Sequence, residues 1–278
     1  MEIRPLTGAL GAEIIDADIR DPKQFDQIFE AFTNYSVIAI RDQTLSPEDQ
    51  IVFAERFGQI NVNRFFAQLP GYEKVAIVLK EPDQKRAIGE NWHTDHSYDQ
   101  APAMCSILHC IETPEVGGDT MFASMYAAFD ALSEGMKDML RQMKVWHSSR
   151  HAFGQTRQGD EASKTGRIGN PDLATQDALH PVVIRHPLSG REALYVNRGF
   201  TTHFEGWSAA DSQPLLSYLY THGVQPEFTC RLRYRPGTVV MWDNRATWHK
   251  AINDYDGHRR LMHRITVEGP ELAAALAA

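Results

Sequence analysis

The feature of this chain that most limits its fold is a series of short apolar runs, rich in β-branched residues, along almost its whole length. These strand-like runs lie at residues 36–40, 74–79, 104–110, 144–149, 182–186, 193–196, 228–234, 238–242 and 261–267. Helical patterns are fewer and lie at residues 22–34, 46–58, 125–132, 135–143 and 209–221. Many short strands with few helices predict a mainly β protein, a sandwich or barrel that carries helical insertions.

The organisation of the chain favours one domain over residues 1–278. It contains no repeat, no low-complexity block and no Pro/Gly/Ser-rich linker. The stretch 155–178 is polar and glycine-rich without a clear period. We therefore predict that residues 152–180 form a mobile active-site loop, because a long loop inside a compact domain is often a functional lid.

Composition excludes several classes of function. The 28 Lys and Arg residues against 36 Asp and Glu give a formal charge of −8, and the basic residues are not clustered, so a nucleic-acid partner is not expected. No apolar run approaches the ~20 residues of a membrane span, and the first residues lack the apolar stretch of a signal peptide. Cys105, Cys110 and Cys230 are an odd number in apolar contexts. We expect buried thiols in a reducing cytoplasm, hence a cytoplasmic protein without a membrane partner.

Two of the twelve histidines stand in a pattern that suits a metal ion. In the extended segment Trp92-His93-Thr94-Asp95, side chains alternate, so His93 and Asp95 point to the same side. Alone, such a pair is more often a hydrogen-bonded histidine beside a turn-forming aspartate. His249, after a downstream strand and polar turn, completes a set of two histidines and one carboxylate. This set is the facial triad of non-haem Fe(II) oxygenases, although zinc hydrolases use similar ligands and the triad alone does not choose the metal.

Two arginines near the C-terminus suggest a site for an anion. Arg260 and Arg264 are four residues apart, so both face the same side of a strand. The apolar neighbours Leu261, Ile265 and Val267 indicate an inner strand, in which two buried cations would need anionic partners. A small dianionic or paired-anion ligand would supply those partners, whereas a solvated basic strand is the alternative interpretation.

Several longer motifs carry a resemblance to a known family. They are PLTGALGAEI near the N-terminus, FAERFG at 53–58, WHTD at 92–95, GGDT at 117–120, LYVNRGFTT at 194–202, and WDNRATWH with RRLMHR between 242 and 264. With these motifs, the chain resembles the taurine dioxygenase and phenoxyacetate-herbicide dioxygenase family of Fe(II)- and 2-oxoglutarate-dependent enzymes over most of its length. The resemblance implies a double-stranded β-helix, a cupin-like jelly roll, with helical insertions. It also implies a homo-oligomer, a dimer or a tetramer.

The resemblance assigns roles to individual residues. His93, Asp95 and His249 match the iron ligands, and no further catalytic residue is implied. Thr120 and Arg260 match the residues that bind the distal carboxylate of 2-oxoglutarate, and an arginine shortly after the distal histidine favours iron over zinc. Without the family, the GGDT segment would be interpreted simply as a hairpin turn.

The activity implied by the resemblance is a coupled oxidation. With Fe(II), 2-oxoglutarate and O₂, the enzyme would release succinate and CO₂ and hydroxylate a small organic anion. Arg264 matches the residue that binds the anionic group of that substrate. If the hydroxylated carbon also carries a leaving group, the product collapses to a carbonyl compound. Trp242 and Asn244 are expected to support the site by packing and hydrogen bonding.

The substrate pocket departs from the taurine pattern at two positions. Asn63 replaces a histidine that contacts the sulfonate in taurine enzymes, and Gly89 replaces an asparagine. Phe66, Tyr98 and Phe200 are expected to form aromatic walls. We therefore predict an anion with a bulkier and less polar body than taurine: a sulfonate, a sulfate ester or an aryloxyalkanoate-like carboxylate.

Further interpretations stay open at this stage. Arg64 and His96 lie near the predicted pocket, where each is as often a surface or packing residue as a substrate contact. A zinc-dependent hydrolase would use the same triad to activate water. A noncatalytic jelly-roll binding protein would more commonly have lost a ligand, and none is missing.

Overall fold

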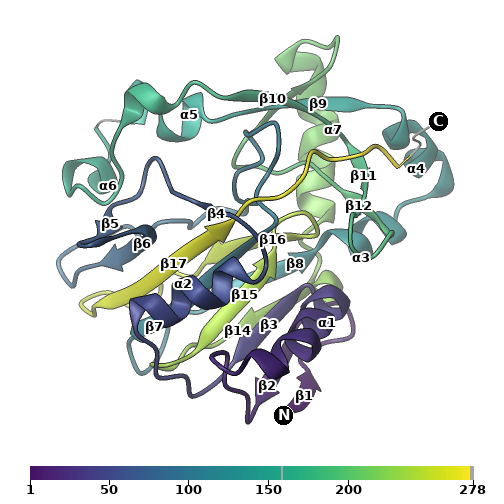
Figure 1. Cartoon of the computed structure of the whole chain (residues 1–278). Coiled ribbons are helices and arrows are strands. Elements are labelled where there is room, and N and C mark those ends of the chain that lie inside the picture. Colours follow the sequence, from purple (N-terminus) through teal and green to yellow (C-terminus); the bar gives the residue numbers. More distant parts are fainter. Residues whose placement is uncertain (158, 276–278) are drawn as a thin grey trace.

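A large sheet and a smaller sheet pack face to face in the computed structural model, which describes residues 1–157 and 159–275 (Figure 1). The strands of the large sheet are β1 (Glu2–Pro5), β2 (Ala12–Ile15), β3 (Val37–Ile40), β4 (Ile60–Asn61), β5 (Gln68–Leu69), β6 (Tyr72–Lys80), β7 (Cys105–Glu112), β15 (Val239–Asp243) and β17 (Arg260–Val267). Their order is β1-β2-β3-β15-β7-β17-β6-β5, with β4 also paired to β17. All pairs are antiparallel except β2 with β3.

The smaller sheet has the order β14-β8-β16, formed by β8 (Thr120–Ser124), β14 (Thr229–Leu232) and β16 (Thr247–Ala251). Apolar side chains from both sheets share one core, in which Leu108 and Met262 of the large sheet lie with Phe122 and Leu232 of the smaller one. From β14 to β17 consecutive strands alternate between the two sheets. This alternation is the winding of a double-stranded β-helix, so the predicted fold class is confirmed.

Two helices cover the outer face of the large sheet (Figure 1). They are α1 (Phe25–Tyr35), preceded by the 3₁₀ turn η1 (Pro22–Gln24), and α2 (Pro47–Glu55). Phe32 of α1 and Phe53 of α2 are buried in the same cluster as Ile38 and Ile107 of the sheet. Ser46 and Asp49 form the capping box that starts α2, within the helical pattern at residues 46–58.

A long insertion separates β8 from β14, although these two strands are neighbours in the smaller sheet. It contains α3 (Met125–Asp130), α4 (Glu134–Arg141), β9 (Lys144–Ser148), β10 (Asp177–Pro181), β11 (Val183–Arg185), β12 (Glu192–Leu194), β13 (Thr201–Phe204), α7 (Ala209–His222) and η4 (Pro226–Phe228). The strands form a β10-β9-β13 sheet and a β11-β12 hairpin. Phe129, Leu194 and Leu216 pack with Trp248 of β16 into a core of their own. The predicted helical insertions therefore occupy one continuous part of the chain.

The predicted loop at residues 152–180 contains more regular structure than its sequence indicates. It includes the second half of α5 (Arg150–Phe153), then η2 (Gln155–Arg157), α6 (Glu161–Lys164), η3 (Pro171–Leu173) and all but the last residue of β10 (Asp177–Pro181), while residue 158 lies outside the described residues. Each helix has only one turn, which is too short to produce a hydrophobic period. The segment contacts the core of the protein where Ile168 forms a β-bridge to Phe66.

Two expectations about the whole chain can be compared with the described residues. None of their helices is both long and apolar enough to cross a membrane. Cys105, Cys110 and Cys230 are free and buried, as predicted. Burial raises the pKa of the Cys110 thiol to about 12, so this group stays uncharged at neutral pH.

Candidate metal centre and its pocket

The three predicted metal ligands meet in the structure. His93 lies in a loop that is hydrogen-bonded to β16 at His249, since the N–H of each residue donates to the carbonyl of the other at 3.1 and 2.8 Å. One possible ligand atom from each of His93, Asp95 and His249 lies within 4.8 Å of the other two. The Asp95 oxygens are 3.7 Å from His93 Nε2 and 3.8 Å from His249 Nε2. These distances exceed those of hydrogen bonds, and the donors instead surround a common point.

Neighbouring groups fix the orientation and charge of these ligands. His93 Nδ1 donates to the carbonyl of Asn91 at 2.7 Å, which leaves the lone pair on Nε2. Burial lowers the pKa of both His93 and His249, so their imidazoles are neutral. Burial alone would raise the pKa of Asp95, but Arg264 and the two histidines hold it below its ordinary value.

Asp95 is held through one of its two oxygens. Oδ2 accepts a hydrogen bond from Ser106 Oγ at 2.7 Å and forms an ion pair with Arg264 Nη2 at 2.9 Å. Two neutral imidazoles and one ionised carboxylate with a free Oδ1 form a donor set that fits Fe(II). His249 Nδ1 is buried and has no hydrogen-bond partner among the described residues, so this ring is fixed by its strand and by packing against Trp242.

A cavity of about 520 Å³ opens beside this centre and contains the predicted cosubstrate residues. Thr120 of β8 and Arg260 of β17 come from the two facing sheets and line the same cavity. The Arg260 guanidinium lies 5.0 Å from the ring centroid of Tyr234, and the Tyr234 hydroxyl donates to Thr120 Oγ1 at 3.1 Å. A buried guanidinium beside a hydroxyl is suited to bind a carboxylate.

The GGDT segment allows Arg260 to approach closely. Gly117 and Gly118 have φ values of +88° and +72°, which favour glycine. A Cβ atom at Gly118 would lie 3.2 Å from Arg260 Cδ, and the Gly118 carbonyl accepts a hydrogen bond from Arg260 Nε at 3.0 Å. Gly118 therefore allows the Arg260 side chain to pack closely against the backbone of this segment, which does more than form a hairpin turn.

The five residues predicted to contact substrate line this same cavity: Asn63, Phe66, Tyr98, Phe200 and Arg264. All five are buried, and the guanidinium of Arg264 lies 5.3 Å from the centroid of the Phe66 ring. Arg264 Nε has no hydrogen-bond partner among the described residues. Gly89, the second departure from the taurine pattern, has φ +84°, and a Cβ there would lie 3.3 Å from His93 Cε1.

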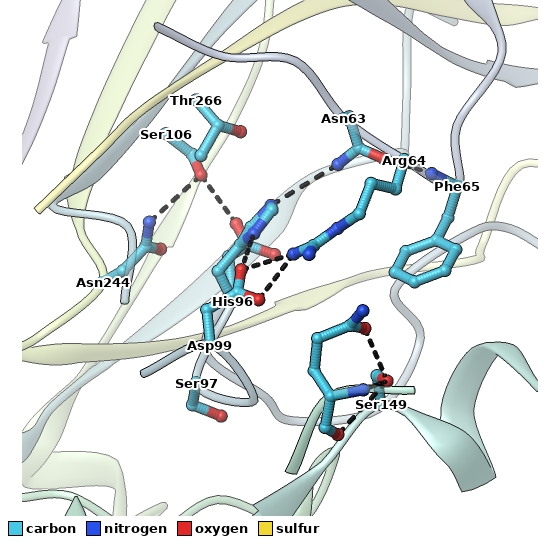
Figure 2. A network of polar contacts seen from close by, with 12 residues as sticks. Asn63, Arg64, Phe65, His96, Ser97, Asp99, Ser106, Ser149, Asn244 and Thr266 are labelled. Atoms are coloured by element: carbon cyan, nitrogen blue, oxygen red, sulfur yellow. Dashed lines mark hydrogen bonds and ion pairs between the residues drawn. The ribbon is translucent and has the colours of Figure 1, made fainter. Parts of the chain in front are cut away.

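Several residues of the cavity cannot be found by motif or periodicity. His151, Phe153 and Arg157 come from the insertion and line the cavity. Ser106 carries a weak signal, because it is a small polar residue inside an apolar strand. Asn244, expected as a supporting residue, donates from Nδ2 to Ser106 Oγ at 3.2 Å (Figure 2).

The fold and the site together define a class of protein. Two histidines and one carboxylate lie in a double-stranded β-helix, next to a buried arginine and a hydroxyl that can bind a second ligand. This arrangement is that of mononuclear non-haem Fe(II) oxygenases, which keep coordination positions open for a cosubstrate and oxygen.

Known proteins similar to this chain include alpha-ketoglutarate-dependent dioxygenases. Residues 2–266 match the family described as "Taurine catabolism dioxygenase TauD, TfdA family". The chain is 33% identical over 274 residues to an alkylsulfatase of Acinetobacter baylyi, covering 97% of this chain and 85% of that protein. It is also 33% identical over 281 residues to an alpha-ketoglutarate-dependent 2,4-dichlorophenoxyacetate dioxygenase of a Burkholderia species, covering 94% and 89%. The solved structure of a putative alpha-ketoglutarate-dependent taurine dioxygenase from Burkholderia xenovorans superposes with a TM-score of 0.83 at 30% identity, covering 100% and 96%.

The chain belongs to the TauD/TfdA family of dioxygenases. The predictions of the family, of a 2-oxoglutarate-dependent oxygenase, and of Fe(II), 2-oxoglutarate and O₂ as its cofactor and cosubstrates are thereby confirmed. The zinc hydrolase and the noncatalytic binding protein find no support.

Proposed function

We propose that this oxygenase hydroxylates a small organic anion that binds between Arg264 and the aromatic wall of the cavity. The observation that carries the proposal is that one cavity contains the His93–Asp95–His249 centre, the pair Thr120 and Arg260, and a second buried arginine. Arg260 has no ion-pair partner among the described residues and suits the cosubstrate carboxylate, because a buried charge needs a partner. Arg264 is paired with Asp95 through Nη2, and its Nε, which has no hydrogen-bond partner among the described residues, can donate to the anionic group of the substrate.

Each group has a distinct role in this proposal. His93, Asp95 and His249 hold Fe(II), while Arg260 and Thr120 bind the distal carboxylate of 2-oxoglutarate. The bound iron and cosubstrate supply the oxidising chemistry, with succinate and CO₂ as products. Arg264 orients the substrate through its anionic group, and buried side chains around the centre exclude water.

The substrate class follows from the walls of the cavity. Phe66, Tyr98 and Phe200 form one buried cluster with the half-buried Ile88 and Phe153, so the body of the substrate meets mainly apolar and aromatic surface. We infer a sulfate ester, a sulfonate or an aryloxyalkanoate-like carboxylate, and the names of the alkylsulfatase and the 2,4-dichlorophenoxyacetate dioxygenase support this range. In such a substrate, hydroxylation of the carbon that carries the ester or ether oxygen releases a carbonyl compound.

A substrate panel tests this proposal. Fe(II)-loaded protein with 2-oxoglutarate is given hexyl sulfate, 2,4-dichlorophenoxyacetate or taurine, and oxygen uptake, succinate and organic product are measured together. We expect equal amounts of succinate and product with hexyl sulfate or 2,4-dichlorophenoxyacetate, and little turnover of taurine. Turnover of taurine alone would contradict the predicted bulkier substrate. Product formation without oxygen uptake would instead indicate a hydrolase.

We also propose that residues 152–180 cover this site. Phe153 and Ile168 of this segment line the cavity, together with His151, which lies just before it. Phe153 stacks on Phe65 with ring centroids 4.3 Å apart and an angle of 9° between the planes. A segment that supplies one wall of the cavity is well placed to admit substrate when it moves.

Two further expectations remain proposals. A homo-oligomer, either a dimer or a tetramer, is supported by the family, and its mass in solution can be measured by light scattering. A cytoplasmic location without a nucleic-acid or membrane partner is supported by the three free buried thiols and by the formal charge of −8.

A further inference from the structure

Charged groups that the proposed reaction does not use connect the GGDT segment, residues 117–120, to the loop before Arg260. Asp119 of this segment is 8% exposed, and its Oδ2 lies 2.5 Å from Arg231 Nε on β14. A second nitrogen of the same guanidinium group, Nη2, lies 3.0 Å from Asp254 Oδ2 in the loop between β16 and β17. One arginine thus ties the GGDT segment to the loop that leads into Arg260.

Asp254 also contacts the backbone of the GGDT segment through its other oxygen. Its Oδ1 accepts a hydrogen bond from the Gly118 N–H at 2.8 Å. A Cβ atom at Gly117, where φ is +88°, would lie 2.7 Å from this oxygen, so the close approach requires glycine at that position. The Ile252 N–H donates to the Asp119 carbonyl at 2.9 Å. Contacts from one loop therefore fix two successive residues of the segment.

Gly118 transmits this restraint to Arg260. Its N–H is held by Asp254, and its carbonyl accepts a hydrogen bond from Arg260 Nε at 3.0 Å. Among the described residues, this carbonyl is the only hydrogen-bond acceptor of the Arg260 guanidinium group. A guanidinium group binds a carboxylate in a fixed planar geometry. A shift of its backbone acceptor therefore changes the direction in which its remaining N–H groups point.

We propose that Asp254 is a positioning residue for the cosubstrate, which aims the Arg260 guanidinium group through Gly118, and that Arg231 holds Asp254 in place. The inference rests on the proposed function, because it requires Arg260 to bind the distal carboxylate of 2-oxoglutarate. Neither Asp254 nor Arg231 lines the cavity, so their effect should appear in the affinity for 2-oxoglutarate and not in the chemical step. Their side chains are 41% and 51% exposed, so replacing them leaves the core intact.

Two substitutions of Asp254 test the contact with Gly118. In Asp254→Ala we expect the KM for 2-oxoglutarate to rise about five-fold or more, the scale of one lost hydrogen bond. The kcat at saturating 2-oxoglutarate should change less than about two-fold, since the residue does no chemistry. In Asp254→Asn the KM should stay within about two-fold of the wild-type value, because the amide oxygen can still accept from the Gly118 N–H. An asparagine variant as impaired as the alanine variant would contradict the role of this hydrogen bond.

The variant Arg231→Met tests the connection between the two carboxylates. It leaves the buried Asp119 carboxylate without its ion-pair partner, so we expect the KM for 2-oxoglutarate to rise about three-fold or more with kcat retained. Arg141→Met is the matched control, because Arg141 also bridges two carboxylates, those of Asp138 and Glu192, and does not line the cavity. The control should leave this KM unchanged. Equal KM values for Arg231→Met and wild type would refute the role of Arg231.

A double variant shows whether Asp254 acts through Arg260. If it does, adding Asp254→Ala to Arg260→Ala should raise the KM for 2-oxoglutarate no further, because the guanidinium group that Asp254 aims is already absent. Effects of the two changes that multiply would contradict the inference.

Binding measurements separate failure of this inference from failure of the proposed function. Calorimetry on Mn(II)-loaded protein gives the affinity for N-oxalylglycine, an unreactive 2-oxoglutarate analogue. If Arg260→Ala bound this analogue as tightly as wild type, the assignment of Arg260 to the cosubstrate would be wrong. If Arg260→Ala lost affinity and Asp254→Ala kept it, Arg260 would keep its role and the positioning role of Asp254 would be refuted. The affinity for Mn(II) itself should be unchanged in Asp254→Ala, and a loss would show that this residue supports the metal centre instead.

Discussion

Arg260 is a buried cation that forms no ion pair with any described residue, although only 6% of it is exposed. Its Nε donates to a backbone carbonyl, and its guanidinium packs against the Tyr234 ring. A buried charge without a counter-charge is costly. The protein tolerates this cost where a ligand supplies the missing charge, which is the role that we propose for the distal carboxylate of 2-oxoglutarate.

Removal of this charge should weaken the binding of 2-oxoglutarate and leave the binding of the metal unchanged. For Arg260→Ala we expect the KM for 2-oxoglutarate to rise at least about 30-fold, roughly 2 kcal/mol, the scale for the loss of one partner of a buried charged pair. Mn(II) affinity, measured by calorimetry, should be retained. Arg259→Ala is the matched control, because Arg259 pairs with Glu81 and Glu112 outside the cavity. An unchanged KM in Arg260→Ala would refute the assignment.

At the residue scale, the groups that carry chemistry are more predictable than the groups that orient them. His93 and Asp95 are two residues apart in an extended segment, so their spacing alone places both on one side. Ser106 has no such spacing signal, because it acts through a contact that only the folded chain creates. Its hydroxyl, on β7, donates to Asp95 in the loop before that strand.

Among the elements, α6 connects its own segment to residues 85–86, and both segments line the cavity. Its Glu161 accepts hydrogen bonds from the backbone N–H groups of Lys85 and Arg86 at 2.8 and 2.7 Å, which hold the pKa of its carboxyl below the ordinary value. Arg167, only 4% exposed, lies 3.3 Å from Glu161 and donates to the Arg86 carbonyl at 2.8 Å. The predicted loop is thus attached to the segment that leads into the WHTD motif.

Loss of this attachment should loosen both segments. For Glu161→Ala we expect faster amide hydrogen exchange at residues 85–90 and 161–168, because the carboxylate that orders them is gone. The KM for the organic substrate should also rise, since a cavity wall becomes less ordered. Glu134→Ala, in the exposed first turn of α4, is the control and should show neither effect. Unchanged exchange would indicate that Arg167 alone maintains the attachment.

In β7, His109 makes the stability of the protein sensitive to acid. Burial, with a smaller contribution from the neighbouring His263, lowers the pKa of His109 to about 4. An unfolded histidine titrates near 6.5, so between these pH values the unfolded chain binds more protons than the folded protein. Stability should therefore fall as the pH decreases from about 6.5 towards 4.

The variant His109→Gln isolates this contribution. Between pH 7 and pH 5, wild-type protein should lose about 2 kcal/mol of unfolding free energy through this group alone, and the variant should lose correspondingly less. Chemical denaturation at the two pH values measures the difference. His258→Gln, at an exposed position, provides the comparison. Equal pH dependence of wild type and His109→Gln would show that other groups determine acid sensitivity.

At the scale of the whole molecule, the proposed ligands would connect the two sheets. The metal centre joins the His93 loop to β16, and the cosubstrate pair joins β8 to β17. A ligand that binds only the folded state stabilises it by mass action, by about 2.7 kcal/mol at a hundred times its Kd. Mn(II) with N-oxalylglycine should therefore raise Tm, and a chelator should reverse the rise. His249→Ala should abolish the shift, and a shift that survives in this variant would place the metal elsewhere.

The overall topology is only partly contained in the sequence pattern. Short strands and the helix starts at Asp21 and Ser46 can be located by periodicity and capping, so the fold class can be predicted from local signals. The pairing of β8 with β14 across the whole insertion cannot be predicted in this way, because no local signal connects residues so far apart in the chain. Likewise, β16 does not stand out as a strand in the sequence, since Thr247–Ala251 lacks a clear apolar alternation.

The insertion lies apart in the sequence from the residues assigned to the metal and the cosubstrate. His93, Asp95 and His249, together with the pair Thr120 and Arg260, all lie outside residues 125–228, and the two ends of the insertion meet at paired strands. The insertion nevertheless supplies Phe153 and Phe200 to the cavity. Evolution or protein design can therefore vary the residues of the insertion that reach the cavity to fit new substrates, while the side chains that pack on Trp248, next to His249, have to be kept for the metal centre to hold its geometry.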